Sequence, residues 1–342
     1  MKHLVTGGSG FLGNLIARRL CAQGEEVRVL DVWEDPSRPA EIEFIKCDVR
    51  DREGVARAMS GVGVVHHNAA LVPITRSGGE FWQVNAEGSR QVAEAAVAAG
   101  VEAFIYMNSC SIYGMPEDSP ITDASPLAPF EIYGRSKLGG EVAVSEVCQA
   151  AGLPLISIRP RTILAAGRSG IFRILFEWIH EGKNVYVIGS GNNPFQFLHA
   201  EDLMDAYLLA YEAGQPGLYN VGTDRYGTLR EMLENLVAYA GSPSKVRSVP
   251  AWAAVNALRV LDWMRLSPLS AWHYRTYHLP YHFDVGKLLK LGWQPRYSND
   301  EMLQESYDWY LAHREQPAAD SAASAHRRGA SQRFLKLIKK FS

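Results

Sequence analysis

The chain opens with Lys2-His3-Leu4-Val5-Thr6-Gly7-Gly8-Ser9-Gly10-Phe11-Leu12-Gly13, and this stretch carries most of the information about the fold. Residues 2–6 form a short, mainly apolar run that predicts a buried strand. Gly7, Gly10 and Gly13 follow it with the spacing G-x-x-G-x-x-G. Glycines at this spacing allow a tight turn and a close backbone approach to a pyrophosphate, with the next helix pointing its N-terminus at the negative charge. The stretch therefore predicts a dinucleotide-binding strand, turn and helix.

The next residues indicate which dinucleotide is bound. A helix is predicted over residues 14–22, and a second strand over 26–30 that leads into Asp31. An acidic residue at the end of this strand accepts hydrogen bonds from the adenosine ribose and repels a 2′-phosphate, which favours NAD over NADP. Arg28 is predicted to face away by strand parity, and Arg38 lies farther along the loop. Either arginine could still weaken the preference for NAD.

A second motif lies about a hundred residues downstream, where Tyr133 and Lys137 are four residues apart in Tyr-Gly-Arg-Ser-Lys. On a helix, two such residues share one face. A nearby ammonium group favours the phenolate, so we expect Lys137 to lower the pKa of Tyr133 from roughly 10 towards neutrality. A phenolate can then accept the proton of an alcohol while hydride leaves the adjoining carbon.

Together these motifs resemble the extended short-chain dehydrogenases/reductases of the NAD-dependent epimerase/dehydratase superfamily. Residues 6–13 match that family's T-G-x-x-G-F-x-G, and the resemblance covers about residues 1–312. The resemblance implies that Asp48 contacts the adenine and that Asn85 supports the active site. It also places Ala69 in the loop that passes under the cofactor. The residues implied to bind NAD are Gly7, Gly10, Phe11, Gly13, Asp31, Asp48, Ala69, Tyr133 and Lys137.

The resemblance also implies a catalytic set. The sequence FIYMNSCSIYG at residues 104–114 is similar to the family's strand that ends in S-S-x-x-V-Y-G, which assigns the catalytic hydroxyl to Ser109, with Ser111 as the alternative. Ser109 would orient the substrate oxygen, Tyr133 would act as general base, and Lys137 would bind the nicotinamide ribose. Tyr113 is interpreted as structural, and nothing near Cys110 suggests an activated nucleophile.

The implied fold is α/β, a doubly wound parallel sheet of the Rossmann type with a smaller C-terminal substrate lobe. We predict an NAD-binding domain at 1–160 and a region at 161–314 that alternates between sheet and lobe. The lobe should contain residues 171–181, a Trp-rich stretch at 250–278 and a last helix near 299–313. A linker at 315–325 and a basic amphipathic tail at 326–342 complete the chain.

Two substrate classes remain open. Nucleotide-sugar enzymes of the family place an Asn where this chain has Thr162 and an Arg where it has Phe195, although several arginines, among them Arg161 and Arg168, could compensate. Arg159 followed by Pro160 resembles the branch of 3β-hydroxysteroid and sterol-4-carboxylate dehydrogenases, whose reaction can include loss of a neighbouring carboxyl group. Several aromatic residues could line an apolar pocket: Phe195, Phe197, Trp252, Trp263, Trp272 and Tyr274. A sterol- or lipid-like alcohol is slightly favoured, and a nucleotide-sugar epimerase or dehydratase is the alternative. A non-catalytic NAD sensor would be expected to lack one of the three catalytic residues.

Composition limits the partners and the compartment. Four scattered cysteines show neither metal-ligand spacing nor a disulfide framework, so no metal is expected. No apolar run reaches the roughly 18 residues needed to cross a bilayer, and the N-terminus is itself a strand, so a cytoplasmic protein is expected. The tail has six Lys and Arg and no acidic residue, with apolar residues at helical spacing, which suits contact with an anionic membrane surface. A homodimer formed partly through the Tyr133 helix is expected, and no nucleic-acid partner is.

Overall fold

A sheet of seven parallel strands forms the centre of the computed structural model, which describes residues 1–73, 78–168, 172–264, 267 and 269–315. Its strands are β1 (Lys2–Thr6), β2 (Glu26–Asp31), β3 (Glu43–Lys46), β4 (Val64–His67), β5 (Ala103–Met107), β6 (Leu155–Pro160) and β10 (Gly217–Val221). The inner strands are almost continuously buried, as expected for a parallel sheet covered on both faces. The predicted doubly wound sheet is confirmed.

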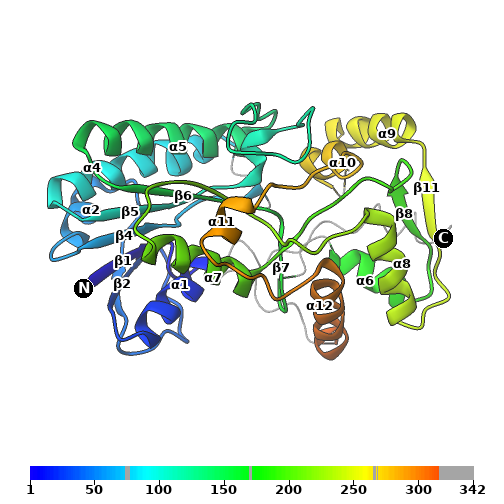
Figure 1. Cartoon of the computed structure of the whole chain (residues 1–342), viewed down its shortest axis with the longest axis horizontal. Helices are drawn as coiled ribbons and strands as arrows, with labels where there is room; N and C mark the ends of the chain where they lie inside the picture. Colours follow the sequence, from blue (N-terminus) through cyan, green and yellow to red (C-terminus); the bar gives the residue numbers. More distant parts are fainter. Residues whose placement is uncertain (74–77, 169–171, 265–266, 268, 316–342) are drawn as a thin grey trace.

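Helices cover both faces of this sheet (Figure 1). On one face lie α1 (Phe11–Ala22) and α7 (Ala200–Glu212), whose apolar residues share one core cluster with the strands. On the other face lie α2 (Arg52–Ala58), α4 (Ser89–Ala99) and α5 (Ile132–Ala151), which pack in a second cluster. Short helical segments lie at α3 (Glu80–Trp82), η2 (Gln83–Gly88) and η3 (Cys110–Tyr113).

The strand order β10-β6-β5-β4-β1-β2-β3 reverses direction between β1 and β4. β1 pairs with β2 on one side and with β4 on the other. The chain therefore adds strands from β1 towards one edge of the sheet and then from β4 towards the opposite edge. In open parallel sheets, ligands bind in the crevice outside the carboxyl ends of the strands at such a point. The topology therefore directs attention to the residues that follow Thr6 and His67.

The C-terminal lobe lies beyond one end of the sheet (Figure 1). Its two small parallel pairs join β7 (Ile163–Leu164) to β9 (Leu198–His199) and β8 (Val185–Ile188) to β11 (Val246–Val249). The remaining helices are α6 (Phe172–His180), α8 (Leu229–Tyr239), α9 (Ala251–Trp263), α10 (Ala271–Thr276), α11 (Gly286–Lys290) and α12 (Asn299–His313). Of these, α11 packs against β10 of the central sheet. The predicted last helix near 299–313 is confirmed, and a capping box formed by Ser298 and Glu301 explains where it begins. The predicted tail and all of the linker except Glu315 lie outside the described residues.

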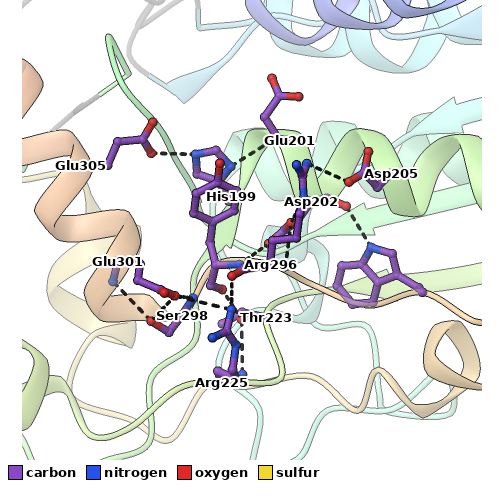
Figure 2. A network of polar contacts seen from close by, with 12 residues as sticks. His199, Glu201, Asp202, Asp205, Thr223, Arg225, Arg296, Ser298, Glu301 and Glu305 are labelled. Carbon is purple, nitrogen blue, oxygen red and sulfur yellow. Dashed lines mark hydrogen bonds and ion pairs between the residues drawn. The ribbon is translucent and has the colours of Figure 1, made fainter.

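A polar network attaches the lobe to the sheet domain at the start of α7 (Figure 2). The fully buried carboxylate of Asp202 accepts hydrogen bonds from the backbone N–H groups of Arg296 and Tyr297, both at 3.0 Å. The guanidinium of Arg296 pairs with Asp205 at 2.8 Å, and the ring of His199 stacks on Tyr297 with 3.7 Å between centroids. These contacts fix the segment before α12 against α7.

None of the helices in the described part of the chain is long and apolar enough to span a bilayer.

Candidate active site

The glycine loop follows β1 directly and forms a cradle at the start of α1. Gly7 has φ +67°, and a Cβ atom there would lie 2.7 Å from the Cα atom of Ala69. A Cβ atom on Gly13 would lie 2.1 Å from the carbonyl oxygen of Gly7, so the helix can approach the turn only without a side chain. The N–H of Gly10 donates to the same carbonyl oxygen at 3.1 Å. The loop therefore brings bare backbone to the N-terminus of α1, which is the geometry that a pyrophosphate requires.

Asp31 ends β2 beside this loop. One carboxylate oxygen accepts the N–H of Ser9 at 3.0 Å, and the other accepts the N–H of Trp33 at 3.3 Å. Burial raises the pKa of Asp31, while these backbone N–H groups act in the opposite direction. The carboxylate is thus held at the edge of the glycine loop, where an adenosine ribose would lie.

Neither nearby arginine is directed towards a 2′-phosphate. Arg28 is buried and pairs with Glu43 at 2.8 Å, and it donates to the backbone carbonyl oxygens of Ala58 and Ser60. Arg38 pairs with Glu34 at 2.6 Å. Asp48, the predicted adenine contact, forms an ion pair with Arg50 at 2.6 Å. The charges around the adenosine end therefore agree with the prediction of NAD.

The loop after β4 is tied to the predicted catalytic helix. Asn85 accepts the N–H of Leu71 at 2.8 Å, donates to the carbonyl oxygen of Leu71 at 3.1 Å and donates to Ser136 at 3.0 Å. Ala69 lies against Gly7 in the same loop, and its N–H donates to Thr6 at 3.3 Å. Asn85 thus connects the floor of the crevice to α5.

The structure brings Ser109 and Tyr133 together. Ser109 follows β5 and caps the short helix η3, where its hydroxyl accepts the N–H of Ser111 at 3.2 Å, and it lies close enough to Tyr133 to act on the phenol, whose pKa it lowers. The hydroxyl of Ser111 is buried with no partner among the described residues. Tyr113 is buried and bonds to Asn220 at 2.9 Å, in keeping with a structural role. Burial raises the pKa of the Cys110 thiol, which favours the unreactive thiol form.

Lys137 lies on α5 one turn after Tyr133, yet it does not lower the pKa of the phenol as predicted. Its ammonium donates to the carbonyl oxygen of Met107 at 2.7 Å and lies 4.7 Å from the centre of the Tyr106 ring. Burial lowers the pKa of Lys137 to about 7 and raises that of Tyr133 to about 12. The expectation of a phenolate near neutrality is wrong for this structure, because burial of the phenol disfavours its charged form.

Two charged residues that the sequence did not assign to catalysis act on Tyr133. The Arg168 guanidinium lowers the pKa of the phenol, whereas Glu131 raises it. Glu131 lies two residues before Tyr133, and burial raises the pKa of its own carboxyl to about 7. Its proximity to Tyr133 in the sequence was a signal that could have identified it, but Arg168 is distant in the sequence.

The predicted substrate residues are mostly core residues. Phe195 and Phe197 are 1% and 0% exposed and pack against each other with 5.1 Å between ring centroids. Thr162 lies between β6 and β7, and its carbonyl oxygen accepts the N–H of Leu198 at 3.1 Å. Trp252 and Trp263 are 76% and 85% exposed on α9, so the expectation that they line an enclosed pocket is wrong.

The residues present fit NAD, because the cradle tolerates no side chain at Gly7 or Gly13 and Asp31 is held at its rim. Among the described residues, no group of three or more His, Cys, Asp or Glu side chains is arranged to hold a metal ion.

Comparison with known proteins agrees with this geometry. The chain is 38% identical over 336 residues to the uncharacterized protein y4nG of Sinorhizobium fredii, covering 98% of this chain and 85% of that protein. It is 26% identical over 341 residues to a 3-beta-hydroxysteroid dehydrogenase of Mycolicibacterium neoaurum, covering 90% of this chain and 91% of the relative.

Among solved structures, the UDP-glucose 4-epimerase of Thermus thermophilus in complex with NAD has a TM-score of 0.71 and 27% identity, covering 91% of this chain and 99% of that one. Residues 3–222 match the family described as the NAD dependent epimerase/dehydratase family, for which NAD is the cofactor. The chain therefore belongs to the NAD-dependent epimerase/dehydratase family of enzymes.

Proposed function

We propose that the chain transfers hydride between NAD and a secondary alcohol carbon, with Ser109, Tyr133 and Lys137 as its active-site residues. The observation that supports this proposal is that Ser109, after the carboxyl end of β5, lies close enough to Tyr133 at the start of α5 to lower the pKa of its phenol. The two hydroxyls come from different elements, the end of β5 and the start of α5. A substrate oxygen between them could bond to both.

In the oxidative direction the alcohol oxygen donates its proton to the phenolate of Tyr133 while the carbon loses hydride and becomes a carbonyl carbon. NAD, when bound, accepts that hydride. Ser109 would donate a hydrogen bond to the same oxygen and hold it in place. Lys137 would bind the ribose next to the nicotinamide and add positive charge behind Tyr133.

The pKa values of this site set a condition for activity. Tyr133 must lose its proton before it can act as base, and burial holds its pKa at about 12. Positive charge brought close to the phenol when the ligand binds would lower this pKa and favour the phenolate. Arg168 already acts in this direction, and the positive charge of oxidised nicotinamide would act in the same direction.

The first substrate candidate is a nucleotide sugar, which would be epimerised or dehydrated after hydride transfer. Similarity to an NAD-bound UDP-glucose 4-epimerase over nearly the whole chain favours this class. Arg168 offers a partly buried cation near Tyr133 for an anionic substrate group.

The second candidate is a sterol- or lipid-like 3β-alcohol, with loss of a neighbouring carboxyl group as a further possibility. The observation in its favour is α9, which has no buried residue and carries the exposed Trp252 and Trp263 at its two ends. Exposed tryptophans are typical of segments that rest in the interface of a bilayer. The similarity to a 3-beta-hydroxysteroid dehydrogenase is of the same order as that to the epimerase.

The lipid candidate predicts that the full-length chain sediments with vesicles that contain anionic lipid. Trp252→Ser combined with Trp263→Ser should weaken sedimentation several-fold, because interfacial binding scales with buried apolar area. Trp82→Ser, which removes a tryptophan that is 48% exposed on α3, is the matched control. Equal sedimentation of all three proteins would exclude a role of α9 in membrane contact.

One assay separates the two classes. Wild type and Tyr133→Phe are incubated with NAD and a panel of sterols, 4-carboxysterols and UDP- or GDP-sugars, and both NADH and sugar products are measured. Sterol-dependent NADH that is absent with Tyr133→Phe supports the lipid class, and isomerised sugar without net NADH supports the nucleotide-sugar class. Turnover that survives unchanged in Tyr133→Phe would contradict the proposed catalytic role of Tyr133.

A further inference from the structure

Three arginines follow β6 or lie at its end, and their guanidinium groups have different surroundings. Arg159 forms a buried ion pair with Glu141 and also donates to Tyr113 at 2.6 Å. Arg161 donates to the carbonyl oxygen of Gln196 at 3.1 Å and lies among aromatic rings, the nearest being Tyr281 at 4.2 Å. Arg161 is 2% exposed, and its Nη1 atom has no hydrogen-bond partner among the described residues. Both side chains are thus held within the interior of the protein, away from solvent and ligand.

The third, Arg168, differs in being only partly buried and in lying against Phe11 beside the glycine loop. Its guanidinium carbon lies 4.8 Å from the centre of the Phe11 ring, and its Nη1 atom is buried without a hydrogen-bond partner among the described residues. No carboxylate in the described part of the chain forms an ion pair with it. Burial lowers the pKa of Arg168 to about 10, which reflects the cost of keeping this charge away from water.

A guanidinium that is partly withdrawn from water is costly unless a counter-charge and hydrogen bonds compensate it. In the described residues that counter-charge is absent, although Arg168 remains protonated at neutral pH. A family enzyme that binds a dinucleotide has an external source of negative charge, since the ligand brings phosphate groups into the site. The bound ligand is therefore the natural partner of this side chain.

The position of Arg168 specifies where that partner lies. Phe11 is the first residue of α1 and follows the glycine loop, so one side of the guanidinium adjoins the predicted pyrophosphate site. Tyr133 is close enough for Arg168 to lower the pKa of its phenol. Arg168 thus contacts the first residue of α1 beside the glycine loop and lies within electrostatic reach of Tyr133.

We propose that Arg168 binds a phosphate oxygen of the ligand in this position, either from the pyrophosphate of NAD or from the diphosphate of a nucleotide substrate. The planar guanidinium can donate two parallel hydrogen bonds to a phosphate, and its stacking on Phe11 holds it in one orientation. The inference rests on the proposed function only in assuming that the glycine loop binds NAD.

Binding is measured by calorimetry on full-length wild type, Arg168→Met and Arg168→Lys, first with NAD alone and then with UDP added to NAD-saturated protein. Arg168→Met should bind the ligand that supplies the phosphate on the order of tenfold or more weakly than wild type does, and Arg168→Lys should have an intermediate affinity. Weaker NAD binding identifies the cofactor as the source, and weaker UDP binding at unchanged NAD affinity identifies the substrate.

The matched control is Lys287→Met on α11. Lys287 is another cation over an aromatic ring, with its Nζ atom 4.1 Å from the centre of the Tyr219 ring, but its ammonium already has partners in the backbone carbonyl oxygen of Leu218 and the carboxylate of Asp123. This variant should leave both affinities unchanged. Arg168→Met that binds NAD and UDP as wild type does, within about twofold, overturns the proposal.

Thermal unfolding supplies a second readout. Without ligand, Arg168→Met should melt no lower than wild type, because the substitution removes a partly buried charge that has no ion-pair partner in the described part of the chain. If NAD is the source of the phosphate, NAD should raise the melting temperature of the variant less than that of wild type. A ligand-free variant that melts well below wild type, with affinities unchanged, would show a structural role and overturn the proposal.

These measurements do not depend on turnover. Tyr133→Phe removes the proposed base without touching Arg168, so a protein carrying both Tyr133→Phe and Arg168→Met should show the same loss of affinity as Arg168→Met alone. Failure of every alcohol in the turnover assay would therefore count against the proposed function and leave this test intact.

Discussion

Lys137 shows how burial controls the chemistry of a single side chain. Its ammonium is 3% exposed and is held by one carbonyl oxygen and one aromatic face. Burial lowers its pKa to about 7, so at neutral pH the group is close to its titration midpoint. A lysine in this state gains a full charge readily when an anion or an acceptor comes near.

The first prediction concerns the pH dependence of stability. In the unfolded chain Lys137 stays protonated up to the ordinary lysine pKa of 10.5, whereas in the folded chain it releases its proton near pH 7. Between these two pH values the unfolded state therefore binds more protons than the folded state, so the free energy of unfolding rises with pH. The free energy of unfolding of wild type relative to Lys137→Met should therefore increase by about 2 kcal/mol from pH 7 to pH 9. Urea denaturation at both pH values measures it.

The raised pKa of Tyr133 does not affect this comparison, because its stabilising proton is lost only as the pH rises above 10 and both proteins retain the residue. A difference in unfolding free energy that stays constant from pH 7 to pH 9 would contradict the lowered pKa of Lys137.

The second prediction concerns Asp31 and the choice of dinucleotide. Asp31→Ser removes the negative charge that would repel a 2′-phosphate and the acceptor of the Ser9 N–H. The preference for NAD over NADP, measured as a ratio of dissociation constants by calorimetry, should fall by on the order of tenfold or more. Glu34→Gln, which neutralises a neighbouring exposed acid paired with Arg38, should retain most of the preference. Equal ratios for wild type and Asp31→Ser would argue against the assigned role.

At the scale of elements, α5 carries Tyr133 and Lys137, and one buried ion pair joins it to the sheet. Glu141 on α5 pairs with Arg159 on β6 and also accepts hydrogen bonds from Asn108 and Ser157. The pair thus ties the catalytic helix to the ends of β5 and β6. Its removal should affect stability and the position of Tyr133 together.

The third prediction tests this connection. Glu141→Gln leaves the buried charge of Arg159 without its partner, so the free energy of unfolding should fall by about 3–5 kcal/mol. Glu146 lies on α5 as well, and Glu146→Gln breaks its exposed ion pair with Arg90 on α4, which should cost no more than about 1 kcal/mol. Denaturant unfolding of the three proteins measures both costs, and similar stabilities of the two variants would show that the buried pair does not hold α5.

At the scale of the whole molecule, α5 also borders an open groove on the outer face of the sheet domain. Trp82, Leu138 and Val142 contribute apolar surface there, and Val142 is 48% exposed. An exposed apolar surface beside the catalytic helix suits the predicted homodimer, in which the same helices of two copies would pack together.

The fourth prediction is that wild type sediments as a dimer and that Val142→Glu is monomeric at the same concentration. A carboxylate placed in an apolar interface costs free energy in both copies of a symmetric contact. Leu289→Glu changes a residue of similar exposure on α11 and should remain dimeric. Dimers of Val142→Glu as stable as those of wild type would place the interface elsewhere.

The sequence alone was sufficient for the features that depend on neighbours along the chain. The glycine spacing predicted the turn and helix start at Gly7 to Gly13, and the position of Asp31 predicted its place beside the glycine loop. The four-residue interval of Tyr133 and Lys137 predicted a shared helix. Each of these follows from backbone geometry within one or two elements, and the family resemblance added Ser109.

Tertiary structure decided what depends on distant contacts. The packing of strands and helices far apart in the sequence buried the phenol of Tyr133, which raised its pKa, and enclosed Phe195 in the core. It also left Trp263 in solvent and brought Arg168 against Phe11 without a counter-charge among the described residues. Desolvation and charge pairing depend on the whole surroundings of a group, so no local pattern of residues could have predicted them.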